Sequence, residues 1–247
     1  MKIFIDAGHN HSGEDTGAEG NGLKEQDITY AVASELSRLL NLVKIETKLS
    51  RNSVFDNIGT TLSDSINKRV KLANTFKADY FISLHCDSSP SSSPKGSHIC
   101  IYKEGGDSER LANYINPYLL KLGLEGRSNI VSIRKDLGVL KHTNMPAILI
   151  EMGFISNFEN AKLQRDNPDK IAKAIFNGIC DFLNDENNIT INTVTPIPKE
   201  YLSATDSISV LVNKGIIVEG DKWYNGTWND NDFKWLLRKV GTYINEH

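Results

Sequence analysis

Apolar residues along the chain follow two alternating spacings, each typical of one kind of element. Short, nearly continuous apolar runs are typical of buried strands, and apolar residues that recur every three or four positions are typical of amphipathic helices. The runs predict strands at residues 2–6, 43–48, 80–85, 98–102 and 147–151. The helical spacing predicts helices at residues 24–43, 66–76, 109–122 and 170–183. Residues 7–22 are rich in glycine and are expected to form a loop.

This alternation of strands and helices defines the fold class. It favours a mostly parallel sheet covered on both faces, so we predict an open, twisted α/β sheet for residues 1–184. Sites in such sheets lie at the carboxyl ends of the strands. Three predicted strands lead at that end into chemically useful residues: Asp6 followed shortly by His9, then His85, then Glu151.

The apolar pattern stops near residue 184, which predicts a domain boundary. Residues 185–199 are polar and contain Pro196 and Pro198, so we interpret them as a linker. Residues 200–247 are expected to form a small, mainly helical C-terminal domain. All three tryptophans lie there, at Trp223, Trp228 and Trp235. Such aromatics stack on sugars, anchor an interface between copies of a chain, or form the core of a small domain, and these alternatives stay open.

Composition excludes several classes of partner. The 247 residues carry a net charge of −3, so no global basic field indicates nucleic acid. No stretch approaches the roughly 18 apolar residues of a membrane helix, and no membrane insertion is expected. The apolar run near the N-terminus covers only residues 3–5, too short for a signal peptide, so synthesis in the cytoplasm is expected. Three cysteines, an odd number, argue against a disulfide framework.

Two histidines and one glutamate are candidate metal ligands. His9 lies in the glycine-rich loop, His85 ends a buried strand, and Glu25 begins the first long helix. A catalytic zinc site takes three nitrogen or carboxylate ligands. Their spacing fits no short local motif, so the fold would have to gather them. Each also has an ordinary structural interpretation; a carboxylate in the first turn of a helix favourably meets the helix dipole.

Glu151 follows four apolar residues at the end of a predicted buried strand. An ionised carboxylate at such a position is costly without a partner. Burial raises the pKa of a carboxyl group and a nearby cation lowers it, so Glu151 suits a general acid or base beside a metal site. An ion pair with an arginine is the structural alternative.

Three separated segments together resemble a known family. They read IDAGHNHSGEDTGAEGNGLKEQD, NKRVKLANTFKADYFISLHCDS and MPAILIEMGFISN, in this order, within residues 1–183. They are similar to the zinc-dependent N-acetylmuramoyl-L-alanine amidases of type 3. The resemblance implies peptidoglycan as substrate and one Zn²⁺ per catalytic domain, bound by His9, Glu25 and His85. It also implies that Glu151 is the catalytic glutamate, which accepts a proton from water and delivers it to the departing alanine nitrogen.

The glycine-rich loop departs from the family pattern. The family has D-P-G-H-G-G-x-D-P-G-A, whereas this chain has DAGHNHSGEDTGA, with Ala7 in place of proline and two extra residues. His11 is therefore a second candidate for the ligand in this loop, although His9 directly follows the glycine, as in the pattern. Cys86 is adjacent to His85, but neighbouring side chains on a strand point to opposite faces.

Other residues are candidates for supporting roles. Arg69 could orient Glu25 or another carboxylate, or form a surface ion pair. Asp87 stands where the family has asparagine, and either tunes the site or faces water. His142 precedes the Glu151 strand and is a candidate substrate contact; His98 is expected to be an ordinary structural residue.

Three functions are compatible with these residues. The first is a zinc amidase, as in a phage or prophage endolysin of a Gram-positive host or in an autolysin, released to the wall through a separate membrane pore or by lysis. Its C-terminal domain would then bind the cell wall or associate with itself. The second is a non-catalytic wall-binding protein. The third is a zinc carboxypeptidase or endopeptidase acting on the stem peptide, with Arg127 or Arg134 holding a terminal carboxylate.

Overall fold

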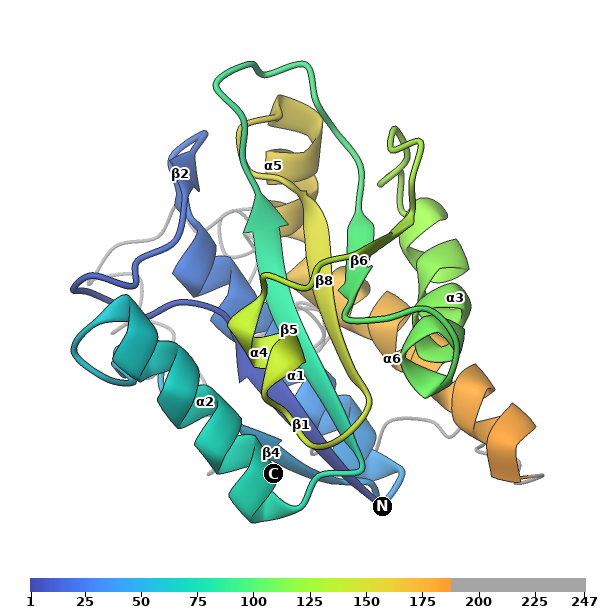
Figure 1. Ribbon diagram of the computed structural model, residues 1–247. Helices are drawn as coiled ribbons and strands as arrows, with labels where there is room; N and C mark the ends of the chain where they lie inside the picture. Colours follow the sequence, from blue (N-terminus) through green and yellow to red (C-terminus); the bar gives the residue numbers. More distant parts are fainter. Residues whose placement is uncertain (188–247) are drawn as a thin grey trace, which may run out of the picture. The chain divides into compact units, whose positions relative to one another are not determined.

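A six-stranded sheet runs through residues 1–187, the part of the chain that the computed structural model describes (Figure 1). The strand order is β4-β1-β5-β8-β6-β7. The strands are β1 (Lys2–Ala7), β4 (Glu46–Leu49), β5 (Tyr80–Asp87), β6 (His98–Ile101), β7 (Val131–Ile133) and β8 (Ala147–Phe154). A short antiparallel pair, β2 (Glu19–Gly20) and β3 (Leu23–Lys24), precedes the first helix.

Four strands of the sheet are parallel, since β1 pairs with both β4 and β5, and β5 pairs with β8. The exception is one edge, where β6 runs antiparallel to β8, and β7 follows the direction of β6. The prediction of an open, mostly parallel α/β sheet is confirmed. The reversed edge was not predicted, because alternating elements do not reveal the direction in which a strand enters the sheet.

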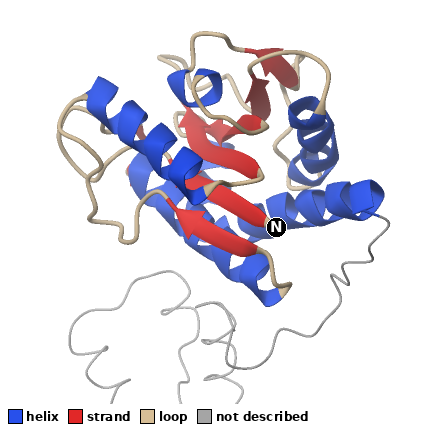
Figure 2. Cartoon of the chain, turned by 60° about the horizontal axis from the view of Figure 1, so that its bottom comes forward, coloured by secondary structure: helices blue, strands red, loops and turns tan. Residues whose placement is uncertain are grey.

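Helices cover both faces of the sheet, as predicted. They are α1 (Glu25–Leu42), α2 (Leu62–Phe76), α3 (Asp107–Leu120), α4 (Gly138–Lys141), α5 (Phe158–Asp166) and α6 (Pro168–Asn187). On the face towards the viewer in Figure 1, α2 and α4 pack over the strands, while α1 and α6 lie behind them. Figure 2 shows the same layers from below, with helices on either side of the strands.

The strand sequences reflect this double coverage. Ile3, Phe4 and Ile5 are consecutive in β1 and are all buried, because one face meets α2 and the other meets α1. A strand covered on both faces has an almost continuous apolar sequence instead of an alternating one. The apolar cluster beneath α2 and α4 includes Phe81 of β5 and Leu149 of β8.

Boundaries differ from the predictions by a few residues where turns intervene. The strand expected at 43–48 begins at Glu46, because Lys44 takes a left-handed conformation (φ 62°) after α1 ends. The short elements β2, β3, β7 and α4 and the helix α5 were not predicted; β2 lies within the segment expected to be a loop. α5 has a weak apolar period but a clear N-cap, in which the Asn157 side chain accepts a hydrogen bond from the Asn160 amide.

Residues 185–187 of the predicted linker belong to α6. The rest of the predicted linker and the predicted C-terminal domain, with Trp223, Trp228 and Trp235, lie outside the described residues. Among residues 1–187, none of the helices combines the length and the apolar character that crossing a bilayer requires.

We predict that Gly178→Ala destabilises the fold although alanine favours helices. A Cβ atom at Gly178, in α6, would lie 2.4 Å from the Cα of Ile115 in α3. Because that neighbour is backbone, the two helices must move apart, at a cost of about 1–3 kcal/mol. Thermal unfolding of the full chain followed by circular dichroism checks this. Asn67→Ala, at an exposed position in α2, is the control and should leave the melting temperature unchanged or raise it slightly; equal melting temperatures for Gly178→Ala and the parent chain contradict the prediction.

Candidate metal centre and active site

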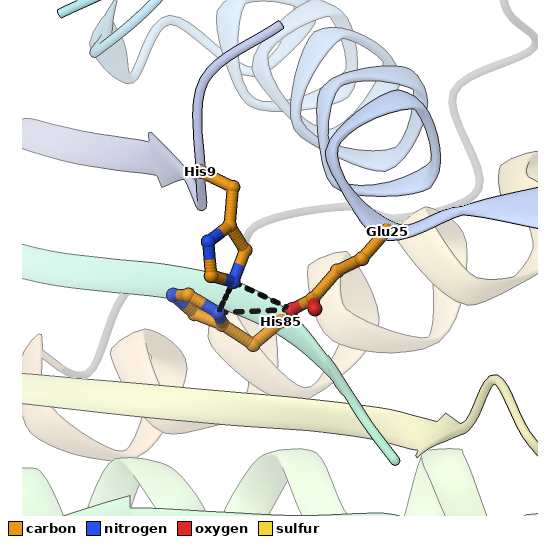
Figure 3. Close-up of side chains that lie close together, drawn as sticks. All are labelled: His9, Glu25 and His85. Carbon is orange, nitrogen blue, oxygen red and sulfur yellow. Dashed lines mark hydrogen bonds and ion pairs between the residues drawn. The ribbon is translucent and has the colours of Figure 1, made fainter. Parts of the chain in front are cut away.

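The side chains of His9, Glu25 and His85 meet at the carboxyl end of the sheet (Figure 3). They come from the loop after β1, the first residue of α1, and β5. The distance from Nδ1 of His85 to Nε2 of His9 is 3.1 Å. Oε1 of Glu25 lies 3.1 Å from that His9 nitrogen and 3.0 Å from the same His85 nitrogen. The fold therefore brings together three residues that are distant in the sequence.

These separations suit a small divalent ion. Ligand atoms about 2.0–2.1 Å from a tetrahedral zinc ion lie roughly 3.3 Å from one another, slightly farther apart than the three atoms here. Two imidazole nitrogens and one carboxylate oxygen are a ligand set that zinc accepts, with a fourth position left for water or substrate. In the part of the chain that the structure describes, this is the one group of three or more such residues that converges in this way.

Two glycines allow these side chains to approach one another so closely. A Cβ atom at Gly8 would lie 2.5 Å from Cε1 of His85, and one at Gly17 would lie 2.6 Å from Cβ of Glu25. His9 itself has a left-handed backbone (φ 64°), which is uncommon for a residue with a side chain. The surrounding contacts must therefore hold the loop in this conformation.

Asp15 orients the ring of His9. Its Oδ1 lies 3.1 Å from Nδ1 of His9, and Ser65 donates a hydrogen bond to its other oxygen. A carboxylate behind a histidine ligand fixes the ring and directs the far nitrogen towards the metal. Burial lowers the pKa of His9, but hydrogen bonds to Asp15 and Glu25 outweigh it and raise this pKa to about 9. Asp15 could not be predicted from the sequence, because a carboxylate in a polar loop carries no distinctive spacing.

Glu25 is held by the backbone. Its Oε2 accepts a hydrogen bond from the amide of Ala18 at 2.9 Å, and its Oε1 accepts one from the amide of Cys86 at 2.9 Å. Burial opposes ionisation, yet hydrogen bonding to His85 and His9 keeps the pKa of Glu25 well below its usual range. The Cys86 thiol is buried and does not belong to the converging group.

Arg69 contacts other carboxylates than Glu25. Its guanidinium binds Asp6 at 2.5 Å, lies 3.7 Å from Asp15, and donates to the carbonyl oxygen of His9 at 2.6 Å. Burial raises the pKa of Asp6, but Arg69 outweighs this effect and holds it below its ordinary value. Arg69 thus supports the loop that carries His9. Its ion pair with Asp6 is buried and does not lie on the surface.

The remaining candidates lie apart from this group. His11 is exposed and stacks edge-on against Phe55. The carbonyl oxygen of His142 accepts from Asn74 at the end of α2, where β5 and β8 begin, so His142 lies at the opposite end of these strands from His85 and Glu151. Asp87 forms an ion pair with Arg127.

Glu151 lies next to the converging group. In the sheet it is in register with His85 of β5, so the two side chains project from the same face of neighbouring strands. Burial raises the pKa of Glu151, and the positive charges of His85, His9 and Arg127 only partly oppose this. Its Oε2 is buried and has no hydrogen-bond partner among the described residues. A carboxyl group with a raised pKa beside a metal site can both accept and return a proton.

Comparisons with known proteins show which family the chain resembles. A family described as N-acetylmuramoyl-L-alanine amidase matches residues 3–181. The amidase LytC of Bacillus subtilis is 36% identical over 186 residues, and the match covers 73% of this chain but only 35% of LytC. The chain therefore spans about a third of that relative. An uncharacterised B. subtilis protein, YqiI, is 37% identical, with 72% of this chain and 82% of YqiI covered. The endolysin of Bacillus phage SPP1 is 31% identical, with 74% and 66% covered.

Solved structures show the same fold. The CwlD amidase of Clostridioides difficile, solved in complex with the GerS lipoprotein, superposes with a TM-score of 0.66 at 29% identity and covers 74% of this chain and 98% of that one. The catalytic domain of the amidase CwlV from Bacillus (Paenibacillus) polymyxa gives a TM-score of 0.62 at 29% identity, with the same coverage. On the extent of the family match and of these similarities, the chain belongs to the N-acetylmuramoyl-L-alanine amidase family.

Proposed function

We propose that this chain is an N-acetylmuramoyl-L-alanine amidase that hydrolyses the amide bond between the lactyl group of N-acetylmuramic acid and L-alanine in peptidoglycan. The observation that carries the proposal is the convergence of His9, Glu25 and His85 beside Glu151. The family match and the amidase relatives support the choice of bond.

One zinc ion fits the site. His9 would bind it through Nε2, His85 through Nδ1 and Glu25 through Oε1, since these atoms face one another. When bound, zinc supplies Lewis-acid chemistry, which polarises a carbonyl group and makes water more acidic. The nitrogen and carboxylate ligand set, with Asp15 behind His9, is typical of catalytic zinc sites.

Glu151 carries the proton transfers. As the oxygen of a water molecule bonds to the lactyl carbonyl carbon, the Glu151 carboxylate accepts the proton that this water loses. The protonated carboxyl group then donates the proton to the alanine nitrogen while the carbon–nitrogen bond breaks. The products are the lactyl carboxylate on the glycan and a peptide with a free N-terminal alanine. The raised pKa of Glu151 suits a group that must hold the proton between these two steps.

The stem-peptide carboxypeptidase is a weaker candidate. Such an enzyme needs a cation to hold the terminal carboxylate of its substrate. Arg127 already forms an ion pair with Asp87, and Arg134 forms one with Asp136. Mass spectrometry of digested muropeptides separates the two activities, because an amidase releases intact stem peptides with N-terminal alanine. A non-catalytic wall-binding protein would release no peptide at all.

The biological role we propose is lysis of the bacterial cell wall. The SPP1 endolysin relative supports a phage or prophage enzyme that is made in the cytoplasm and reaches the wall through a separate membrane pore or on lysis. Wall binding by residues 200–247, with self-association as the alternative, completes the proposal. A second binding site on the same polymer would raise the local substrate concentration.

Glu151→Gln should abolish most turnover and leave zinc bound. The amide has nearly the same shape as the carboxylate but cannot accept and return a proton, so the rate of peptide release should fall on the order of 10²- to 10⁴-fold. The assay is release of N-terminal alanine peptides from purified cell walls, with zinc measured by elemental analysis of the dialysed protein. Glu159→Gln, an exposed glutamate in α5, is the matched control and should act like the parent chain. Full activity of Glu151→Gln removes Glu151 from the mechanism.

Asp15→Asn should weaken zinc binding. Without the carboxylate, the ring of His9 loses the acceptor that fixes it, and loss of such a partner typically costs 10- to 100-fold in metal affinity or activity. Competition with a chelator of known affinity measures the change. Glu14→Gln, the neighbouring exposed position, should bind zinc with the parent affinity; identical affinities for both variants would exclude the role assigned to Asp15.

Zinc binding should release protons at neutral pH. In the metal-free protein the pKa of His9 is about 9, so its ring is protonated at pH 7, and it must become neutral to bind a metal. The apparent affinity should therefore rise about tenfold per pH unit between about pH 6 and pH 8 through this residue. Calorimetry in two buffers with different ionisation enthalpies counts the released protons. Asp15→Asn should release fewer, and a binding heat independent of the buffer contradicts the prediction.

A further inference from the structure

His98 lies directly opposite Glu151, on the other side from the metal ligands. In the antiparallel pairing of β6 with β8, His98 is in register with Glu151, and in the parallel pairing of β5 with β8 the same glutamate is in register with His85. Residues opposite each other on neighbouring strands project from the same face, with Cα atoms about 4.5–5.5 Å apart. Glu151 thus stands between two histidines, of which only His85 belongs to the converging metal group.

Two buried polar atoms in this pair have no hydrogen-bond partner among the described residues. One is Oε2 of Glu151 and the other is Nδ1 of His98. Leaving a buried polar atom unpaired costs about 1–3 kcal/mol, and more for a charged group, so such atoms are rare unless they have a function. A carboxylate oxygen accepts hydrogen bonds and an imidazole nitrogen can donate one. The two unpaired atoms are therefore complementary.

The surroundings of His98 suit the tautomer that has its proton on Nδ1. Its Nε2 lies 2.8 Å from the Ser132 hydroxyl oxygen and 3.4 Å from the Cys100 sulfur, and the Ser132 hydroxyl can either donate to this nitrogen or accept from it. When Ser132 donates to Nε2, the neutral ring carries its proton on Nδ1, next to Glu151. Burial, and then the positive charge of Arg134, lower the pKa of His98 and favour this neutral ring.

We propose that His98 is a positioning residue for Glu151, whose Nδ1–H donates a hydrogen bond to Oε2 and aims the carboxylate at the reacting water. The inference rests on the proposed amidase function. A change of side-chain torsion or one bridging water joins the two atoms, as catalytic hydrogen bonds commonly tighten only when the site is filled. Ser132 fixes the ring from behind, so Ser132, His98 and Glu151 form a chain across three strands, β7, β6 and β8.

Kinetics of three His98 variants of the full, zinc-loaded chain test this. An asparagine side chain places its amide nitrogen as many bonds from the backbone as Nδ1, whereas glutamine places its own at the distance of Nε2. His98→Asn should therefore retain most of the parent kcat on a soluble muramoyl peptide. His98→Gln and His98→Phe should lose on the order of 10- to 100-fold in kcat, with KM changed less than about twofold. His11→Gln, an exposed histidine, is the control.

A merely structural role for His98 gives a different pattern. In that case the kcat of all three variants follows their melting temperature, and asparagine does not rescue. Equal kcat for His98→Asn and His98→Gln, at equal zinc content, overturns the proposal.

A second measurement does not depend on enzymatic activity. It therefore tests the role of His98 even if the variants fail to fold or the chain does not hydrolyse the muramoyl peptide. Nitrogen-15 NMR of the zinc-loaded parent chain reads which imidazole nitrogen carries the proton. We expect His98 to be neutral with the proton on Nδ1, and Glu151→Leu to shift that signal while His11 stays unchanged. A proton on Nε2 refutes the hydrogen bond. If the parent chain releases no peptide, the proposed amidase function is contradicted. The NMR result still decides whether His98 donates a hydrogen bond to Glu151.

Discussion

The buried ion pair between Arg69 and Asp6 is the contact on which the site depends. Both side chains are almost fully buried, and each charge is tolerated only because the other compensates it. From this position the guanidinium also binds the carbonyl oxygen of His9 and the side chain of Asn10. One cation from α2 thereby fixes the end of β1 and the loop that follows it. Removing it would leave Asp6 charged and unpaired in the interior, so a change at Arg69 affects both the fold and the site.

The strand order explains how Glu151 comes to lie beside His9, Glu25 and His85. β5 lies between β1 and β8, so His85 has the His9 loop on one side and Glu151 on the other. The carboxyl ends of these three parallel strands lie at the same end of the sheet. The first turn of α1 places Glu25 there as well. The proposed metal ligands and the proposed proton acceptor are thus separate groups on adjacent elements. This separation lets the pKa of Glu25 stay low while burial raises that of Glu151.

The reversed edge of the sheet adds a second neighbour to Glu151. Because β6 runs antiparallel to β8, its first residue, His98, stands opposite a residue in the middle of β8. If β6 were parallel to β8, its carboxyl end would lie at the end of the sheet where His9, Glu25 and His85 meet, and His98, its first residue, would lie at the opposite end. The direction of one edge strand therefore decides which side chains surround the glutamate.

The sequence by itself determined the fold class, most elements and the residues with chemistry to offer. Apolar spacing reports burial directly, so β1, β5, β8 and the long helices could be predicted within a few residues, and His9, Glu25, His85 and Glu151 could be named as candidates. Only the tertiary structure decided which residues meet. Asp15 behind His9, Arg69 bound to Asp6, the distant place of His142 and the pairing of His98 with Glu151 all depend on strand direction and loop path. Hydrophobic spacing is a property of neighbours along the chain, whereas hydrogen bonds and ion pairs form between neighbours in space, and no local pattern encodes them.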